Sequence, residues 1–141
     1  DDNHPLDRRD FLPRDVADII GRDAAEHFPD GARPLVRMTA RGLLASHDCY
    51  TFLSRVRGWN VDYLWWDGAT VERTNAADYV LYQKGFQDFY PGAHFYDLYP
   101  AAEADFAAGK YPYDLVARVK APAPAEIIIY RKRQAPAAAT P

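Results

Sequence analysis

The residues best suited to binding chemistry lie in one stretch, residues 75–99, which reads NAADYVLYQKGFQDFYPGAHFYDLY. An apolar run, Tyr79–Tyr82, breaks at Gly85 and is followed by a segment rich in Phe and Tyr. Aromatic faces beside carboxylate and amide groups can bind a sugar or a polyprenyl chain, or can lie at a membrane interface, where Tyr is enriched. We therefore predict a ligand-binding surface made by Tyr82, Phe86, Gln87, Phe89, Tyr90 and Tyr96. The alternative is that the rings form a small apolar cluster beneath a long loop.

Nucleophilic and metal chemistry find little support in the sequence. His47-Asp48-Cys49 contains the residue types that a cysteine nucleophile needs. However, neighbours on a helix point about 100° apart, and Cys49 falls on an apolar stripe, so we interpret it as a buried structural residue. The histidines have no paired metal-ligand spacing, and we predict no metal site. Neither a glycine-rich phosphate loop nor a G-x-S-x-G nucleophile elbow occurs, so no catalytic residue is assigned.

Three carboxylates deserve separate mention. Asp62, Asp67 and Asp78 lie at predicted strand ends, where an α/β fold carries its chemistry. Helix capping and turn formation explain them equally well. One hypothesis is therefore a small hydrolase or transferase that uses His47 or Asp62; two others are given below.

Composition limits the classes of function. Hydrophobic residues make up 48% and charged residues 26% of the 141 residues, which is ordinary for a globular core. The net charge of −3 argues against a nucleic-acid partner, which would require a basic surface. The chain does not begin with Met and both ends resemble linkers, so we expect a piece of a larger or processed protein. We predict a linker or tail over 1–12, a single α/β domain over 13–133 and a disordered Ala/Pro tail over 134–141.

The first half of the domain is predicted to alternate helices and strands: helix Pro13–Phe28, strand Pro34–Thr39, helix Ser46–Arg57 and strand Trp59–Trp66. Pro13 suits a first helical turn, because the N–H that it lacks would have no partner there. Gly58 is expected to stop the second helix. The buried stripe of that helix is predicted to be Cys49, Phe52, Leu53 and Val56.

The second half is predicted to contain strand Asp78–Gln83, helix Ala101–Ala108, and strands Tyr113–Lys120 and Glu126–Arg133. The apolar run Ile127–Tyr130 is continuous, which indicates a strand buried on both faces. The connection between the last two strands is too short for a parallel crossover, so they should pair antiparallel. The element order α-β-α-β-β-α-β-β predicts an α/β fold: a three-layer, mostly parallel sheet with a C-terminal antiparallel hairpin.

Two strands also carry a family pattern. Ala77–Tyr82 reads A-D-Y-V-L-Y, Gln87 follows, and Ile127–Arg131 reads I-I-I-Y-R. This resembles the C-terminal soluble part of bacterial GT-C type membrane glycosyltransferases, the group related to dolichyl-phosphate-mannose–protein mannosyltransferases and aminoarabinose transferases. Those proteins often end in an A-D-Y-V-V-x-Y strand and a hairpin whose last strand is like I-x-I-Y-R. The segments 86–99 and 59–66 depart from the family pattern.

The resemblance implies an accessory extracytoplasmic domain of an enzyme that uses a polyprenyl-phosphate sugar. Such a domain is not catalytic alone, because the catalytic carboxylate of the family lies between transmembrane helices, outside this chain. It would help to position the acceptor or the lipid-linked donor. The implied partners are the membrane domain of the same polypeptide and a polyprenyl-phosphate sugar or glycan acceptor, at the periplasmic face of the cell membrane. No cofactor is expected in this fragment.

An alternative hypothesis needs no membrane enzyme. The chain would be a free-standing α/β binding or interaction module, which uses the aromatic loop 86–99 to hold a partner protein.

Overall fold

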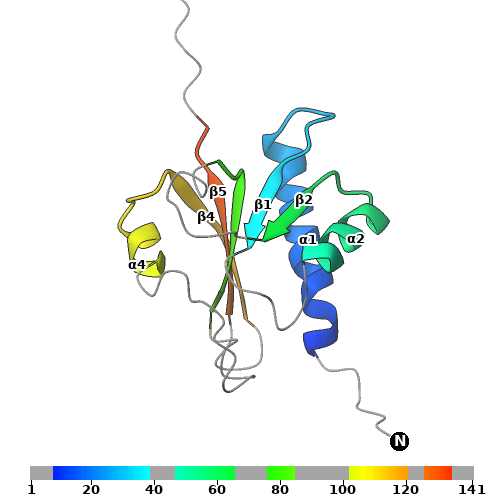
Figure 1. The fold of residues 1–141 in the computed structure, drawn as a ribbon, viewed down its shortest axis with the longest axis horizontal. Coiled ribbons are helices and arrows are strands. Elements are labelled where there is room, and N and C mark those ends of the chain that lie inside the picture. The colour runs from blue at the N-terminus through cyan, green and yellow to red at the C-terminus, as the bar shows by residue number, and fades with distance from the viewer. Residues whose placement is uncertain (1–7, 39–46, 66–75, 85–101, 121–125, 135–141) are drawn as a thin grey trace, which may run out of the picture.

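The computed structural model describes residues 8–38, 47–65, 76–84, 102–120 and 126–134, and these form an α/β domain around a five-stranded mixed sheet (Figure 1). The elements are α1 (Arg8–His27), β1 (Leu35–Met38), α2 (His47–Val56), β2 (Asp62–Trp65), β3 (Tyr79–Lys84), α4 (Ala102–Ala107), β4 (Tyr113–Lys120) and β5 (Glu126–Lys132). This is the order predicted from the sequence, and the α/β class is confirmed.

The sheet has the strand order β2-β1-β3-β5-β4. Strand β1 pairs in parallel with both β2 and β3, whereas β5 pairs antiparallel with both β3 and β4. The predicted C-terminal antiparallel hairpin is therefore confirmed. Ile127, Ile128 and Ile129 of β5 are fully buried, as a strand covered on both faces requires.

Alternate residues of the central strands enter two separate apolar clusters, one on each face of the sheet. Tyr79 and Leu81 of β3 join the residues of α1, β1, α2 and β2, whereas Val80 and Tyr82 join Phe106 of α4. Figure 1 shows the same division, with α1 and α2 on one side of the sheet and α4 on the other. The period of two along β3 thus divides the core between the two sides.

Helix α1 begins earlier than the sequence pattern predicted. It starts at Arg8, so Pro13 lies inside the helix rather than in its first turn, and the predicted start is wrong. An interior proline lacks the N–H that would bond to the carbonyl of Arg9. Leu12 and Val16 are almost completely buried in the main cluster, and their burial offsets this cost.

Helix α2 is rotated relative to the predicted stripe. Tyr50 and Ser54 are the buried residues, whereas Phe52 and Val56 are each 66% exposed, so these two core predictions are wrong. The ring of Tyr50 stacks on that of Tyr63 in β2, with centroids 5.1 Å apart. Because this large aromatic contact lies on one side of α2, the helix turns Tyr50 inward.

The predicted end of α2 at Gly58 is confirmed. Gly58 has φ of 81°, a conformation that glycine adopts without steric cost. The amide of Trp59 donates to the carbonyl of Ser54 at 2.7 Å, and that of Gly58 donates to Arg55 at 3.1 Å. These two bonds form a Schellman motif, which satisfies the last helical carbonyls.

Candidate functional site

The strand order defines where a ligand site is expected. Strands β1, β2 and β3 are parallel, so their carboxyl ends lie at one edge of the sheet. The chain passes from β1 to β2 on one side and then to β3 on the other side of β1. Open α/β sheets bind ligands outside the carboxyl ends of their strands, at such a reversal of direction. We call this location the β1/β3 carboxyl edge.

The predicted aromatic segment is joined to this edge by the chain itself. Strand β3 ends at Lys84, so the chain leaves β3 at the carboxyl edge immediately before the segment 86–99. Five predicted ligand-binding residues lie outside the described part of the chain: Phe86, Gln87, Phe89, Tyr90 and Tyr96. Their role in binding stays a prediction.

Tyr82 is the one predicted ligand-binding residue that the structure describes. It is 5% exposed and belongs to the cluster with Phe106 and Ile128. Its ring is therefore part of the apolar core on the face of the sheet that α4 covers.

Arg37 is a residue of this edge that the sequence analysis did not identify. It is half-buried, is the last but one residue of β1, and is opposite Val80 of β3 in the parallel register. The signal was present, because the alternation of β1 places Arg37 on the opposite face from the buried residues Val36 and Met38. A cation in this position suits an anionic group of a ligand.

Two of the three carboxylates predicted at strand ends, Asp62 and Asp78, lie at the amino ends of their strands and not at the edge where an α/β sheet carries its chemistry. Asp62 is the first residue of β2 and Asp78 precedes β3, so both are at the amino edge. The carboxylate of Asp78 accepts a hydrogen bond from the amide of Leu35 at 2.8 Å. Arg55 donates to Asp62 at 3.3 Å. Both side chains therefore connect neighbouring segments, and Asp67 lies outside the described residues.

The residues that carry the family resemblance form hydrogen bonds within the fold. Strands β3 and β5 are neighbours, and Tyr79 is opposite Arg131 in their antiparallel register. The hydroxyl of Tyr79 and the guanidinium of Arg131 each donate to the carboxylate of Asp23 in α1 at 2.6 Å. Burial, together with the hydrogen bond to Asp23, raises the pKa of Tyr79, so its phenol remains a donor. The carbonyl of Ala77 accepts from the hydroxyl of Tyr113 at 2.6 Å.

A second carboxylate of α1 is also engaged in the fold. Asp18 is 6% exposed and accepts two hydrogen bonds from Arg57, at 2.9 and 2.8 Å, and one from the indole N–H of Trp59, at 2.9 Å. The bonds from Arg57 hold the pKa of Asp18 below its usual value, so the carboxylate stays ionised. This group attaches α1 to the end of α2.

The residues considered for nucleophilic chemistry do not form a catalytic arrangement. Nε2 of His47 lies 3.2 Å from the exposed carboxylate of Asp48. Cys49 is partly buried, and this burial raises the pKa of its thiol, which disfavours the reactive thiolate. Among the described residues, no group of three or more His, Cys, Asp or Glu side chains is placed to hold a metal ion.

Comparison of the chain with protein-family models, with curated proteins and with solved structures gave no match. Within the part of the chain that the structure describes, no helix has the length and apolar character needed to cross a membrane. The resemblance to the GT-C type glycosyltransferases therefore rests on the residues of β3 and β5, and its functional content is a proposal.

Proposed function

We propose that this chain is a non-catalytic accessory domain that binds a sugar-bearing ligand at the β1/β3 carboxyl edge. One observation carries the proposal: β3 ends at Lys84 at the carboxyl edge, next to the point where the strand order reverses, and the aromatic segment 86–99 comes next in the sequence. That is the position in which an α/β sheet provides a binding site. Aromatic faces and the neighbouring amide of Gln87 suit the apolar face and the hydroxyl groups of a sugar.

A binding role is favoured over catalysis because two carboxylates of low exposure, Asp18 and Asp23, are engaged in structural hydrogen bonds. In the described residues, the low-exposure carboxylates of Asp18 and Asp23 are both held by arginine and aromatic donors. They hold α1 against the rest of the domain, and a group committed in this way is not available as a general base.

The wider setting follows from the family resemblance. We propose that the domain is the extracytoplasmic part of a polyprenyl-phosphate-sugar-dependent membrane glycosyltransferase, at the periplasmic face of the cell membrane. Its partners would be the membrane domain of the same polypeptide and the lipid-linked donor or glycan acceptor. We further propose a three-layer architecture, which is supported by the contacts of Phe106 on the face opposite α1 and α2.

The proposal is tested by binding of a short-chain polyprenyl-phosphate hexose to the 141-residue chain, with the free hexose as a second ligand. We expect the double substitution Phe89→Ala and Tyr96→Ala to weaken binding about thirtyfold, since the two aromatic contacts contribute about 1 kcal/mol each. The matched control is Phe52→Ala, which removes an exposed ring of α2 at a distance in sequence from this edge. An equal loss in the control variant would overturn the assignment of the site.

The role of Arg37 gives a second readout of the same site. The variant Arg37→Gln should weaken binding of the phosphate-bearing ligand more than binding of the free hexose, because only the former carries an anion.

The full reading frame should also encode several apolar spans of about 20 residues before Asp1. A frame without such spans would refute the membrane-enzyme setting but not the binding site.

The alternative is a free-standing interaction module. Two apolar side chains one helical turn apart on α2, Phe52 and Val56, are each 66% exposed, and exposed apolar groups of this kind often mark partner surfaces. Such a module would hold its partner protein with the aromatic loop 86–99. The Phe89→Ala and Tyr96→Ala variant would then lose the partner in a pull-down, while binding of sugar and lipid would be unchanged.

A further inference from the structure

A second site lies at the opposite edge of the sheet. A half-open cavity of about 250 Å³ is bounded by the second half of α1, by the turn that precedes β1 and by the link that precedes β2. Its lining includes Ala24, Ala25, Asp30, Trp59 and Asn60. The cavity lies at the amino edge, away from the β1/β3 carboxyl edge.

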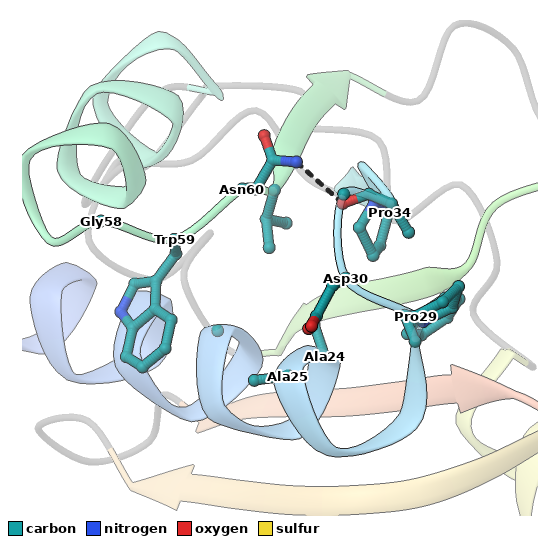
Figure 2. Close-up of a pocket in the computed structure, with 13 residues that line it drawn as sticks. Ala24, Ala25, Pro29, Asp30, Pro34, Gly58, Trp59 and Asn60 are labelled. Atoms are coloured by element: carbon teal, nitrogen blue, oxygen red, sulfur yellow. Dashed lines mark hydrogen bonds between the residues drawn. The ribbon is translucent and has the colours of Figure 1, made fainter.

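Small residues of α1 form the floor of the cavity. Gly21, Ala24 and Ala25 follow the spacing i, i+3, i+4, which places them on one face of the helix, and Phe28 comes directly after the helix ends. Figure 2 shows Ala24 and Ala25 below the opening, with Trp59 and Pro34 on either side. A helix face of this kind would normally pack closely against a neighbour, and here the facing segments leave space.

The two loops that line the cavity are joined to each other by hydrogen bonds. The side-chain amide of Asn60 donates to the carbonyl of Ala32 at 2.8 Å, and the amide of Asp62 donates to the carbonyl of Pro34 at 3.0 Å. The indole N–H of Trp59 is fixed by Asp18. The cavity is therefore formed before any ligand arrives, which lowers the entropic cost of binding.

The charge of the lining favours a cation. Among the lining residues, Asp30 is the one charged side chain, and in the described part of the chain it forms no ion pair. Figure 2 shows its carboxylate directed toward Ala24 of the floor, with Trp59 to the left. The C-terminal end of α1 adds partial negative charge at the same place.

The positively charged side chain of the turn, Arg33, is already engaged by neighbouring polar groups. Arg33 donates to Oδ1 of Asn60 at 3.2 Å, and its Nε lies 3.9 Å from a carboxylate oxygen of Asp62. An anion entering the cavity would therefore meet Asp30 and the helix terminus without a compensating positive side chain in the lining.

The size and the apolar surface define the body of the ligand. A dry cavity of about 150 Å³ can hold a benzene molecule, so this larger space accommodates one compact substituted group. The rings of Trp59 and Phe28 and the alanine floor suit alkyl groups, and the aromatic rings also attract a cation electrostatically.

We propose that this cavity binds a compact organic ammonium ion, with Asp30 as its counter-ion and the Trp59 indole as its apolar wall. The site is distinct from the sugar-binding site proposed above, and neither depends on the other.

The probe is tetramethylammonium chloride, titrated into the 15N-labelled 141-residue chain at constant ionic strength, with sodium chloride and sodium phosphate as reference salts. We expect saturable shifts of the amide resonances of Gly31 and Gly58 with tetramethylammonium alone. Non-saturating shifts, or tighter binding of phosphate, would overturn the proposal.

Three variants separate a specific site from general surface charge. Asp30→Asn should weaken binding about fivefold, as expected for an exposed charge pair. Ala25→Leu should abolish binding by filling the cavity, while helix propensity is nearly unchanged. Glu26→Gln, which removes the same charge from an exposed residue of α1 outside the lining, should have no effect. Equal weakening by Asp30→Asn and Glu26→Gln would refute the proposal, as would an unchanged affinity of Ala25→Leu in a chain whose circular dichroism is native.

Discussion

Gly21 of α1 shows how a tertiary contact can require a residue type that the helix itself disfavours. Gly21 lies in the middle of a helix, where glycine is unfavourable by about 1 kcal/mol relative to alanine. The indole of Trp59 lies so close that a Cβ at this position would overlap it, with Cε2 only 2.6 Å away. The contact with the indole therefore explains the glycine.

We predict that Gly21→Ala destabilises the protein by about 1 to 2 kcal/mol. The steric overlap costs up to about 3 kcal/mol, and the gain in helix propensity recovers about 1 kcal/mol of it. Urea denaturation measures the difference. In a double-mutant cycle with Trp59→Leu, the cost of Gly21→Ala should disappear, because the smaller side chain leaves room for the methyl group. Additive effects would show that Trp59 is not the cause.

Buried tyrosines provide a second test at this scale. The hydroxyl of Tyr50 is buried and has no hydrogen-bond partner among the described residues, whereas that of Tyr113 donates to the carbonyl of Ala77. We predict that Tyr50→Phe raises the free energy of unfolding by about 1 kcal/mol and that Tyr113→Phe lowers it by about 1 kcal/mol. Thermal unfolding of the two variants measures both effects, and a loss of stability in Tyr50→Phe would indicate a partner such as a buried water.

At the scale of elements, α2 is oriented by its contact with β2. Tyr50 stacks on Tyr63, and this contact turns Phe52 and Val56 outward. Leu53 is partly buried against the main cluster. The orientation of the helix therefore differs from the one that its hydrophobic spacing predicts.

This orientation predicts different costs for two adjacent truncations. Phe52→Ala should change the free energy of unfolding by less than about 0.5 kcal/mol, as for other exposed positions. Leu53→Ala should cost about 2 kcal/mol, because it removes buried methyl groups. Guanidinium denaturation of both variants would decide the matter, and the reverse order of costs would support the stripe predicted from sequence.

At the scale of the whole molecule, two carboxylates of α1 connect the helix to different parts of the domain. Asp18 holds Arg57 and Trp59 at the end of α2, whereas Asp23 holds Tyr79 of β3 and Arg131 of β5. The helix is thereby fixed to both the β2 side and the β5 side of the sheet.

The Asp18 contact predicts a dependence of stability on pH. The pKa of Asp18 is lowered in the folded protein, so the unfolded chain takes up the proton first as the pH falls below about 3.9. The stabilisation is therefore present above that pH and is lost as the pH falls toward the folded-state pKa. We predict that Asp18→Asn lowers the free energy of unfolding by about 2 kcal/mol at pH 7, the size expected for hydrogen bonds to a charged group. The variant should also lose less stability than the parent chain between pH 5 and pH 3. Urea midpoints at these pH values measure both effects, with Asp15→Asn, an exposed neighbour on α1, as the control.

The proposed binding site belongs to the scale of the whole molecule as well. The sequence predicts Tyr82 and the aromatic residues after β3 as ligand-binding residues, and this stays a prediction. It did not indicate Arg37, because a lone arginine in a short strand carries no motif. The sequence also placed Asp62 and Asp78 at strand ends without showing which ends face the carboxyl edge. The direction of each strand relative to its neighbours decides this, and that direction depends on pairing between distant segments.

The sequence by itself determined the order of the described elements, most of their approximate bounds, the stop of α2 at Gly58, and the antiparallel hairpin of β4 and β5. These features depend on residues a few positions apart: hydrophobic period, glycine conformation and loop length. Only the tertiary structure decided the strand order, the rotation of α2, the partners of Asp18 and Asp23, and the cavity beside Trp59. These depend on contacts such as that between Asp23 and Arg131, which are 108 residues apart in the chain. The same hydrophobic pattern is compatible with many contacts between distant residues. Packing of the whole domain decides which of these contacts form, so the pattern of neighbouring residues cannot predict them.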